Sequence, residues 1–258
     1  PTTAPQTAPA VPIKGFMLGV LAAKGGLGVS SLVTNLGVTI RKLTGEPVVI
    51  ADFHPGSGDI GLSLGYNSAN GVSNLLKKDA NTISGADIKN EISAHHSGIH
   101  VLTTPQRPRD AIFATRIHQY RSIARQLPDL AKYVLLDLGS ALPPMTQSIL
   151  KYCDKFLIAI EPTPPGVHQT RALLEDLAAL GVGAGRIELV LVNRQRTNLQ
   201  LNWADVQDSV GHTISTVITP APELAYKARE ISSPMVVQQP SSLTAEQFTK
   251  LAASILEQ

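Results

Sequence analysis

The sequence predicts an α/β fold, a doubly wound and mostly parallel sheet of about seven strands with helices on both faces. Short apolar runs alternate along the chain with segments in which apolar residues recur every three or four positions. Two of the runs end in aspartate, which in an open parallel sheet falls at the carboxyl edge, where ligands collect. With 258 residues, 43% of them hydrophobic, the chain can bury one sizeable core. We therefore expect a single domain over residues 14–258.

Residues 1–13 are rich in proline, alanine and threonine and have no apolar face, which predicts a flexible linker. The sequence begins without methionine, so we expect the native chain to continue upstream, although removal of a tag or processing would give the same start. It has no leader-like segment and no apolar run of about 18 residues. A single cysteine, Cys153, excludes an internal disulfide and indicates a reducing compartment, so we expect a soluble, cytoplasmic protein with an inert core thiol.

The first strand, loop and helix organise the whole chain. The run Phe16 to Ala22 predicts a buried parallel strand, and Ser30 to Leu43 predicts an amphipathic helix. The glycines between them would let the backbone N–H groups of residues 25–31 surround an anion at the positive end of the helix dipole. The alternative is a glycine-rich turn that holds no ligand.

Two of the four fixed positions in the phosphate-loop pattern G-x-x-x-x-G-K-[ST] are met, by Gly28 and by Ser30. Ala23 stands at the first glycine and Val29 at the lysine. The loop nevertheless resembles the deviant Walker A loop K-G-G-x-G-K-[ST] of the MinD/ParA family, with its extra signature lysine present as Lys24. The resemblance implies a P-loop NTPase-like fold that binds ATP or ADP with Mg²⁺. It places around the nucleotide Lys24, Gly25, Gly26, Leu27, Gly28, Val29, Ser30 and Ser31, with the Ser30 hydroxyl on the metal.

A second strand, Pro47 to Asp52, ends in an acid at the expected ligand edge. The residues from Asp52 to Asp59 resemble the stretch D-x-D-x-x-x-G-D of the CpaE/TadZ pilus-assembly branch of this family. In the family the second acid of D-x-D contacts or positions the attacking water, and here that position holds His54. The resemblance therefore makes Asp52 and His54 catalytic candidates, with a departure at His54.

Residues 68–97 predict helical pieces, the best of them over 72–78 and 86–92. His95, His96 and His100 follow. We expect no metal site there, because neighbouring side chains on regular elements point apart and no cysteine or carboxylate completes a ligand set.

A third strand over Gly98 to Thr104 precedes a long helix predicted from Ala111 to Leu127. Its arginines at positions 116, 121 and 125 form either a basic face or an ordinary solvated surface. The formal net charge of +2, from 22 basic and 20 acidic residues without a cluster, gives no argument for nucleic acid.

The fourth strand, Tyr133 to Gly139, carries Asp137 in the Walker B pattern of an apolar run ending in an acid. In phosphate-loop proteins that acid holds magnesium directly or through water. We therefore expect Ser30 and Asp137 at the metal, and Lys24, Asp52, His54 and Asp137 as the catalytic positions that the resemblance implies.

A fifth strand over Lys155 to Ile160 precedes a helix predicted from Gln169 to Leu180, and a sixth strand covers Arg186 to Arg194. In MinD/ParA relatives the asparagine of a similar strand-end N-R sits beside the adenine. Asn193 is therefore a candidate contact to the base. The alternative is an asparagine that caps a turn.

The closing segment, Val217 to Val237, resembles the strand, helix and G-x-P-V turn with which the family covers the nucleotide. The last helix, Ser242 to Leu256, should dock on the sheet through an apolar face comprising Leu243, Phe248, Leu251, Ala252 and Ile255. Lys250 is its only basic residue, so it lacks the cationic apolar tail with which MinD binds membranes, and we expect no direct membrane insertion.

The resemblance makes residues 14–258 a MinD/ParA-like nucleotide-binding domain and is closest to CpaE/TadZ, in which receiver-like domains often precede this one. It implies an ATP-binding switch that forms homodimers with nucleotide and helps to localise or assemble a pilus or secretion apparatus, at a pole or a membrane-associated machine. Because Val29 and His54 depart from the pattern, we expect weak or absent hydrolysis. Two alternatives stay open: an active ATPase that uses Lys24 and Asp52, and a ParA-like DNA partitioner, which the scattered charge disfavours.

Overall fold

One mixed sheet runs through the molecule in the strand order β3-β4-β2-β5-β1-β6-β7-β8. The computed structural model describes residues 14–66, 71–195 and 200–257, and the linker predicted over 1–13 lies outside the described residues. The strands are β1 (Phe16–Ala22), β2 (Val48–Asp52), β3 (Ser93–Ala94), β4 (His100–Leu102), β5 (Tyr133–Ser140), β6 (Lys155–Ile160), β7 (Ile187–Val192) and β8 (Ile214–Ile218). All pairings are parallel except that of the short edge strand β3 with β4. The predicted fold class is confirmed, with seven parallel strands and one antiparallel strand in the described chain.

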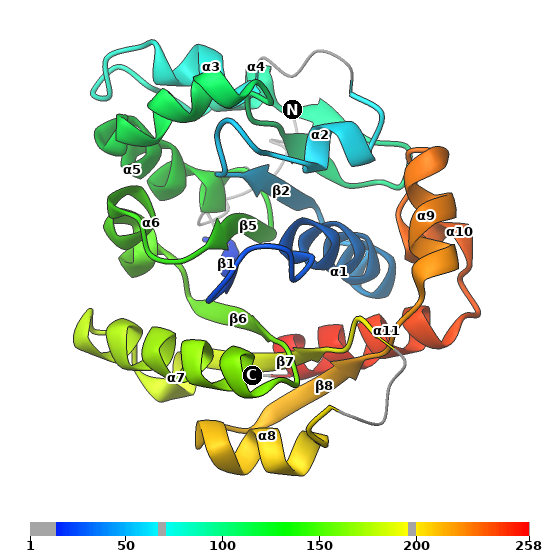
Figure 1. Cartoon of the computed structure of the whole chain (residues 1–258). Helices are drawn as coiled ribbons and strands as arrows, with labels where there is room; N and C mark the ends of the chain where they lie inside the picture. Colours follow the sequence, from blue (N-terminus) through cyan, green and yellow to red (C-terminus); the bar gives the residue numbers. More distant parts are fainter. Residues whose placement is uncertain (1–13, 67–70, 196–199, 258) are drawn as a thin grey trace, which may run out of the picture.

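Helices cover both faces of this sheet, as Figure 1 shows. They are α1 (Val29–Thr44), α2 (Ile60–Ser63), α3 (Gly71–Leu76), α4 (Gly85–Glu91), α5 (Ile117–Gln126), α6 (Pro144–Ile149), α7 (Pro164–Ala179), α8 (Trp203–Val210), α9 (Pro222–Glu230), α10 (Met235–Gln238) and α11 (Leu243–Leu256). Short 3-10 segments cover Pro108–Thr115, Leu127–Asp129, Leu150–Tyr152 and Ala184–Arg186.

Strand β1 lies in the middle of the sheet, and its alternate residues enter two different cores. Met17 and Leu21 pack with residues of α3 to α8, whereas Leu18 and Val20 pack with residues of α1, α2, α10 and α11. This follows from the period of two in a strand, with both faces buried as is usual in a parallel sheet. The sheet therefore separates two apolar layers, with α1 on one side of it and α5 and α6 on the other (Figure 1).

The topology gathers strand ends that are far apart in the sequence. Strand β1 pairs with β5 on one side and with β6 on the other, while β2 pairs with β5. In the last of these pairings Asp52 stands opposite Asp137. Because these strands are parallel, their carboxyl ends meet at one edge of the sheet. At that edge, the connections after β5 and after β6 lie on opposite sides of β1. Such a switch point is where open α/β sheets bind ligands.

The helix predicted from Ala111 to Leu127 is wrong in its first half. Residues Pro108–Thr115 form a 3-10 segment, and α5 begins only at Ile117, after a break at Arg116, whose ψ of 52° is not helical. The 3-10 segment buries none of its residues and instead borders the loop after β2, where a side-chain carbon placed on Gly56 would lie 2.7 Å from Ala111 N. Packing against that loop competes with continuation of the helix.

Other helices also differ from the predictions, in where they begin, in whether they were predicted, or in which face is buried. Helix α7 begins at Pro164 rather than Gln169, because Thr163 caps it by accepting from Gly166 N and prolines suit a first turn. Helices α6 and α8 were not predicted from the sequence. Leu243 is 59% exposed and does not join the docking face of α11, since it lies about 140° round the helix from the buried Phe248.

The prediction that the side chains of His95 and His96 point apart is also wrong. Their ring centroids are 4.0 Å apart, because the backbone turns at this point, with Gly98 N donating to His95 O. Burial, together with the charge of His96, lowers the pKa of His95 to about 4. His95 is thus buried between His96 and Tyr66, whereas His96 is exposed.

Cys153 and the arginines of α5 occupy ordinary positions. Cys153 is buried, and burial raises the pKa of its thiol to about 12, which agrees with an inert core thiol. Arg121 and Arg125 border a shallow polar pocket together with His118, whereas Arg116 is exposed at the break before α5. No helix in the described ranges is long and apolar enough to cross a membrane.

Candidate nucleotide site

The glycine-rich loop between β1 and α1 forms an open cradle of backbone donors. Gly26 and Gly28 have φ angles of 83° and 75°, in the left-handed region that side-chain-bearing residues rarely adopt. Gly28 is the N-cap of α1 and offers no side-chain cap, so the first N–H groups of the helix lack that partner. A side-chain carbon placed on Gly25 or Gly28 would meet only one atom each within 4 Å, Ser140 Oγ at 3.8 Å and Ser31 Cβ at 3.9 Å. The cradle therefore faces open space, as an anion site requires.

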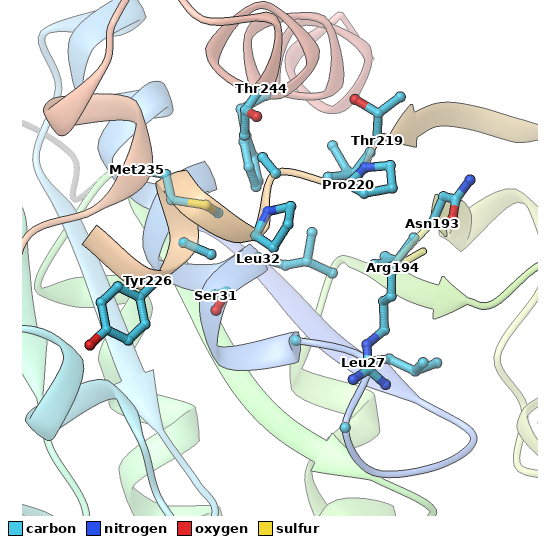
Figure 2. A pocket seen from close by; sticks show the side chains of 18 of the residues that line it. Leu27, Ser31, Leu32, Asn193, Arg194, Thr219, Pro220, Tyr226, Met235 and Thr244 are labelled. Carbon is cyan, nitrogen blue, oxygen red and sulfur yellow. The ribbon is translucent and has the colours of Figure 1, made fainter. Parts of the chain in front are cut away.

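A cavity of about 440 Å³ opens beside this loop. Figure 2 shows its wall, which is built from the loop, the segments after β7 and β8, and helices α9 and α11. It includes Leu27, Asn193, Arg194, Thr219, Pro220 and Tyr226. The volume and the mixed apolar and polar lining suit a small organic ligand whose anionic end lies in the cradle.

Ser30 and Asp137 are joined at the base of the loop. Ser30 Oγ donates to Asp137 Oδ2 at 2.5 Å, and Gly139 N donates to Asp137 Oδ1 at 2.9 Å. Asp137 is 1% exposed, and burial raises the pKa of its carboxyl group, an effect that the hydrogen bond from Ser30 partly offsets. Strand β5 is thus joined to the start of α1 by a side-chain hydrogen bond.

Asp52 lies beside Asp137 with one oxygen unsatisfied. His54 N donates to Asp52 Oδ1 at 3.0 Å, whereas Asp52 Oδ2 is buried and has no hydrogen-bond partner among the described residues. Burial raises the pKa of Asp52 well above its ordinary value, and the negative charge of Asp137 raises it further. Two desolvated carboxyl groups and a hydroxyl are hard oxygen donors, which fits Mg²⁺.

This set is smaller than a protein-only metal cage. In the described chain no group of three or more His, Cys, Asp or Glu side chains is placed to hold a metal ion. Magnesium usually keeps several waters and takes one or two carboxylates together with substrate phosphates, so the donors present fit that use.

The ring of His54 packs over the backbone at the end of β5. A side-chain carbon placed on Gly139, which has a φ of 66°, would lie 3.1 Å from three atoms of that ring. Ser57 Oγ lies 3.3 Å from His54 Nε2. The imidazole is therefore held next to Asp137, whose pKa its charge lowers.

Lys24, the signature lysine of the resemblance, forms an ion pair with Glu161. Glu161 directly follows β6, and its Oε2 also accepts a hydrogen bond from Thr163 Oγ1 at 3.4 Å. The Lys24 side chain is 35% exposed and that of Glu161 17%, so the pair lies near the surface. Sequence reasoning missed Glu161, although an acid directly after a parallel strand is the signal that singled out Asp52.

Two residues of the predicted site have largely buried side chains. Val29 is 8% exposed and Leu27 is 2% exposed, and both belong to the apolar core beneath α1. The Val29 side chain is thus committed to packing and leaves the position of the family lysine without charge. Ser31 lines the cavity instead.

Asn193 was predicted either to contact the base or to cap a turn, and its position is compatible with both. Its Oδ1 accepts from Gln195 N at 3.1 Å, which closes a turn, and the residue also lines the cavity. The turn uses one lone pair of the carbonyl oxygen, so the amide nitrogen and the second lone pair stay available to a base.

Sequence reasoning missed a link between the two sides of the site. Arg229 of α9 forms an ion pair with Asp59, in the loop after β2, and it also lines the cavity. The closing helix is thereby tied to the loop that carries His54. The signal was Asp59 itself, the last acid of the matched stretch, whose partner no local pattern could name.

No protein-family model matches the sequence, and no curated protein matches it either. Solved structures do resemble it. A ParA family ATPase from Chlorobium tepidum TLS superposes with a TM-score of 0.81 at 17% identity, over 92% of this chain and 98% of that one. The septum site-determining protein MinD from Pyrococcus horikoshii OT3, complexed with Mg-ADP, gives a TM-score of 0.81 at 19% identity, over 94% of this chain and 96% of that one.

A third neighbour is the ATP complex of a McdA variant from Cyanothece, with a TM-score of 0.72 and 15% identity over 95% of this chain and 97% of that one. At these identities the likeness concerns the fold. The chain therefore has the fold of ParA and MinD ATPases over nearly its whole length.

Proposed function

From the premise that this chain has the fold of ParA and MinD ATPases, we propose that it binds ATP or ADP with Mg²⁺. The observation that carries the proposal is the open glycine cradle at the start of α1, directly above the bonded pair Ser30 and Asp137. A phosphate chain would lie in the cradle, and the base would lie in the adjoining cavity toward Asn193.

In this proposal, different residues bind the phosphates and the metal. Backbone N–H groups of residues 25–31 bind phosphate oxygens, and the positive end of α1 favours the anion. Ser30 and Asp137 hold the metal, with Asp52 next to them. Magnesium, when bound, neutralises charge on the phosphates. The cation also relieves the repulsion between the two carboxyl groups, so that metal and nucleotide support each other's binding.

Hydrolysis in this proposal is weak or absent. Phosphoryl transfer depends on positioning and on stabilising charge over the phosphate oxygens. Val29 places an apolar, buried side chain where the family has a lysine, and His54 replaces an acid that positions water. The ring of His54 rests on Gly139 and its Nε2 lies 3.3 Å from Ser57 Oγ, so packing and this contact hold it in place.

Turnover measured on purified protein tests this point. We expect phosphate release from ATP to be far slower than in relatives that have both residues, and to rise when Val29→Lys and His54→Asp are combined. The Asp137→Ala variant is the control for contamination, since turnover that survives it does not come from this site. Brisk wild-type turnover that Asp137→Ala abolishes would favour the active ATPase over the weak switch.

The switch itself would act through dimerisation. In the family that the loop resembles, the signature lysine reaches the phosphates of the facing subunit. Lys24 would have to leave Glu161 to do so, which makes assembly depend on bound nucleotide. The homodimer is thus a consequence of the proposed nucleotide site.

The cellular role we propose is to help localise or assemble a pilus or secretion apparatus. The support is the match of Asp52 to Asp59 with the CpaE/TadZ stretch, apart from His54. Cells that lack the protein should lose surface pili or secretion while plasmid maintenance is unchanged. Salt-dependent DNA binding by the purified protein, with loss of plasmids in such cells, would support the partitioner instead.

A further inference from the structure

Arg194, the second residue after β7, lies over the outer side of the glycine-rich loop. Figure 2 shows its side chain running from the end of the strand toward Leu27 and the loop. A side-chain carbon placed on Gly26 would find Arg194 Nη1 as its nearest neighbour, at 3.7 Å. The guanidinium group therefore stands at the rim of the cradle, and the residue lines the same cavity as Gly26, Gly28 and Ser31.

The other cations near the loop are engaged. Lys24 is paired with Glu161, and Arg229, the other arginine of the cavity wall, is paired with Asp59. Among the described residues no carboxylate forms an ion pair with Arg194. Its charge is thus available to an anion in the cradle, and it adds to the positive end of the α1 dipole.

We propose that Arg194 binds the phosphate chain of the nucleotide and supplies, from outside the loop, the positive charge that Val29 does not supply from within. This inference rests on the proposed nucleotide site and assigns that site a further binding residue. A guanidinium group suits the task, because its planar set of donors binds phosphate oxygens in pairs and its long side chain spans the gap from a neighbouring strand. The sheet order makes this possible, since β7 is separated from β1 only by β6.

The proposal predicts an effect on phosphates and not on the base. Arg194→Ala should weaken binding of Mg²⁺–ATP by roughly tenfold to a few hundredfold, the loss expected for a charge-assisted hydrogen bond. Binding of adenosine, which has no phosphate, should be unchanged. Arg194→Lys should keep part of the affinity for ATP, whereas Arg194→Gln, which keeps a polar N–H donor without the charge, should lose about as much as alanine does.

A double-substitution cycle with Val29→Lys gives the sharpest test. If the two positions supply the same charge, Arg194→Ala should cost much less in the Val29→Lys background than in the wild type. Arg229→Ala is the matched control, since it removes the same charge from the same cavity wall but from a side chain already paired with Asp59. It should change affinity for ATP by less than Arg194→Ala does.

The outcomes separate this inference from the function on which it rests. If the wild type binds Mg²⁺–ATP and Arg194→Ala binds it equally well, Arg194 has no such role while the nucleotide site stands. An equal loss for ATP and adenosine would also overturn the inference, because it would place Arg194 at the base. If the wild type binds no nucleotide, the proposed function fails and this inference fails with it. Arg194 is exposed, so the Arg194 variants should unfold thermally as the wild type does, which would show that their comparison concerns binding.

Discussion

The carboxyl groups of Asp52 and Asp137 stand side by side in a part of the protein that excludes water. Burial raises the pKa of both, and mutual repulsion raises that of Asp52 further. Between its ordinary pKa of 3.8 and its raised folded value, Asp52 binds more protons in the folded state than in the unfolded state. The free energy of unfolding therefore falls as pH rises through this window. Asp52 thus costs the metal-free protein stability as pH rises through this window.

Asp52→Asn should accordingly stabilise the metal-free protein at pH 7. The expected gain is about 1.4 kcal/mol for every unit by which the pKa is raised, and it should shrink as pH falls toward about 4, where the wild-type carboxyl group is neutral. Urea unfolding with a chelator present, at several pH values, measures the effect. Asp129→Asn, at an exposed position, is the control and should change little.

Added magnesium and ATP should reverse the order of the two proteins. The cation removes the repulsion in the wild type, while the asparagine variant has lost a donor next to the metal. The account would be contradicted by an Asp52→Asn variant that unfolds more easily than the wild type at pH 7 without metal. That result would show that the Asp52 carboxyl group stabilises the metal-free protein.

The loop after β2 depends on close contact between backbone and site. Gly58 has no room for a side chain, because an added carbon would lie 2.0 Å from Thr104 Cγ2 and 2.5 Å from Asp52 Oδ2. The two atoms belong to the ends of different strands, so the glycine allows the loop to close over both. This loop also carries His54 and Asp59, so its closure positions both residues.

Gly58→Ala should therefore affect stability and the site together. We expect it to lower the free energy of unfolding by about 1–3 kcal/mol through overpacking, and to weaken Mg²⁺–ATP binding by displacing Asp52. Gly183→Ala is the matched control, since nothing lies within 4 Å of the added carbon there. Denaturant unfolding and a binding titration on both variants give the answer, and equal behaviour of the two would refute the close-contact account.

The elements that could be predicted from sequence are those with a strong local signal. The strand over Phe16–Ala22 and the helix from Val29 were predicted to within a residue, because apolar period and glycine position agree there. The 3-10 segment before the break at Arg116 lies against the loop after β2 at Ala111, and no local pattern contains that contact. Helix α8 and the two-residue strand β3 carry too few periodic positions to be recognised.

At the level of the whole molecule, the sheet explains why residues far apart in sequence meet. Asp52 ends β2, Asn193 follows β7, and Asp137 lies within β5 opposite Asp52, so the topology brings all three toward the edge at which the glycine-rich loop lies. Glu161 and Arg194 lie at the same edge but were not singled out. Glu161 matters because it pairs with Lys24, and Arg194 because it lies beside Gly26. Both contacts depend on the order of the strands, which no local sequence pattern specifies.

Nucleotide-dependent dimerisation is the expected behaviour of the assembled molecule. Lys24→Ala should leave the fold intact and abolish the dimer that forms with ATP. Glu161→Gln should free Lys24 and raise the dimer association constant by up to roughly fivefold for each of the two Lys24 residues released, since a pair so near the surface contributes about 1 kcal/mol at most. Sedimentation velocity with and without ATP measures both, and Lys151→Ala, an exposed lysine elsewhere, should behave as the wild type does. A Lys24→Ala variant that dimerises as the wild type does would exclude the facing-subunit role.

Calorimetric titration with Mg²⁺–ATP, followed by a turnover assay on the same sample, tests the central claim most directly. We expect saturable binding of one nucleotide per chain, weaker binding when magnesium is withheld, and loss of that magnesium dependence in Ser30→Ala, with little phosphate released from the wild type. Absence of binding heat at millimolar ATP would contradict the nucleotide site, and rapid phosphate release that disappears in Asp137→Ala would contradict the weak switch.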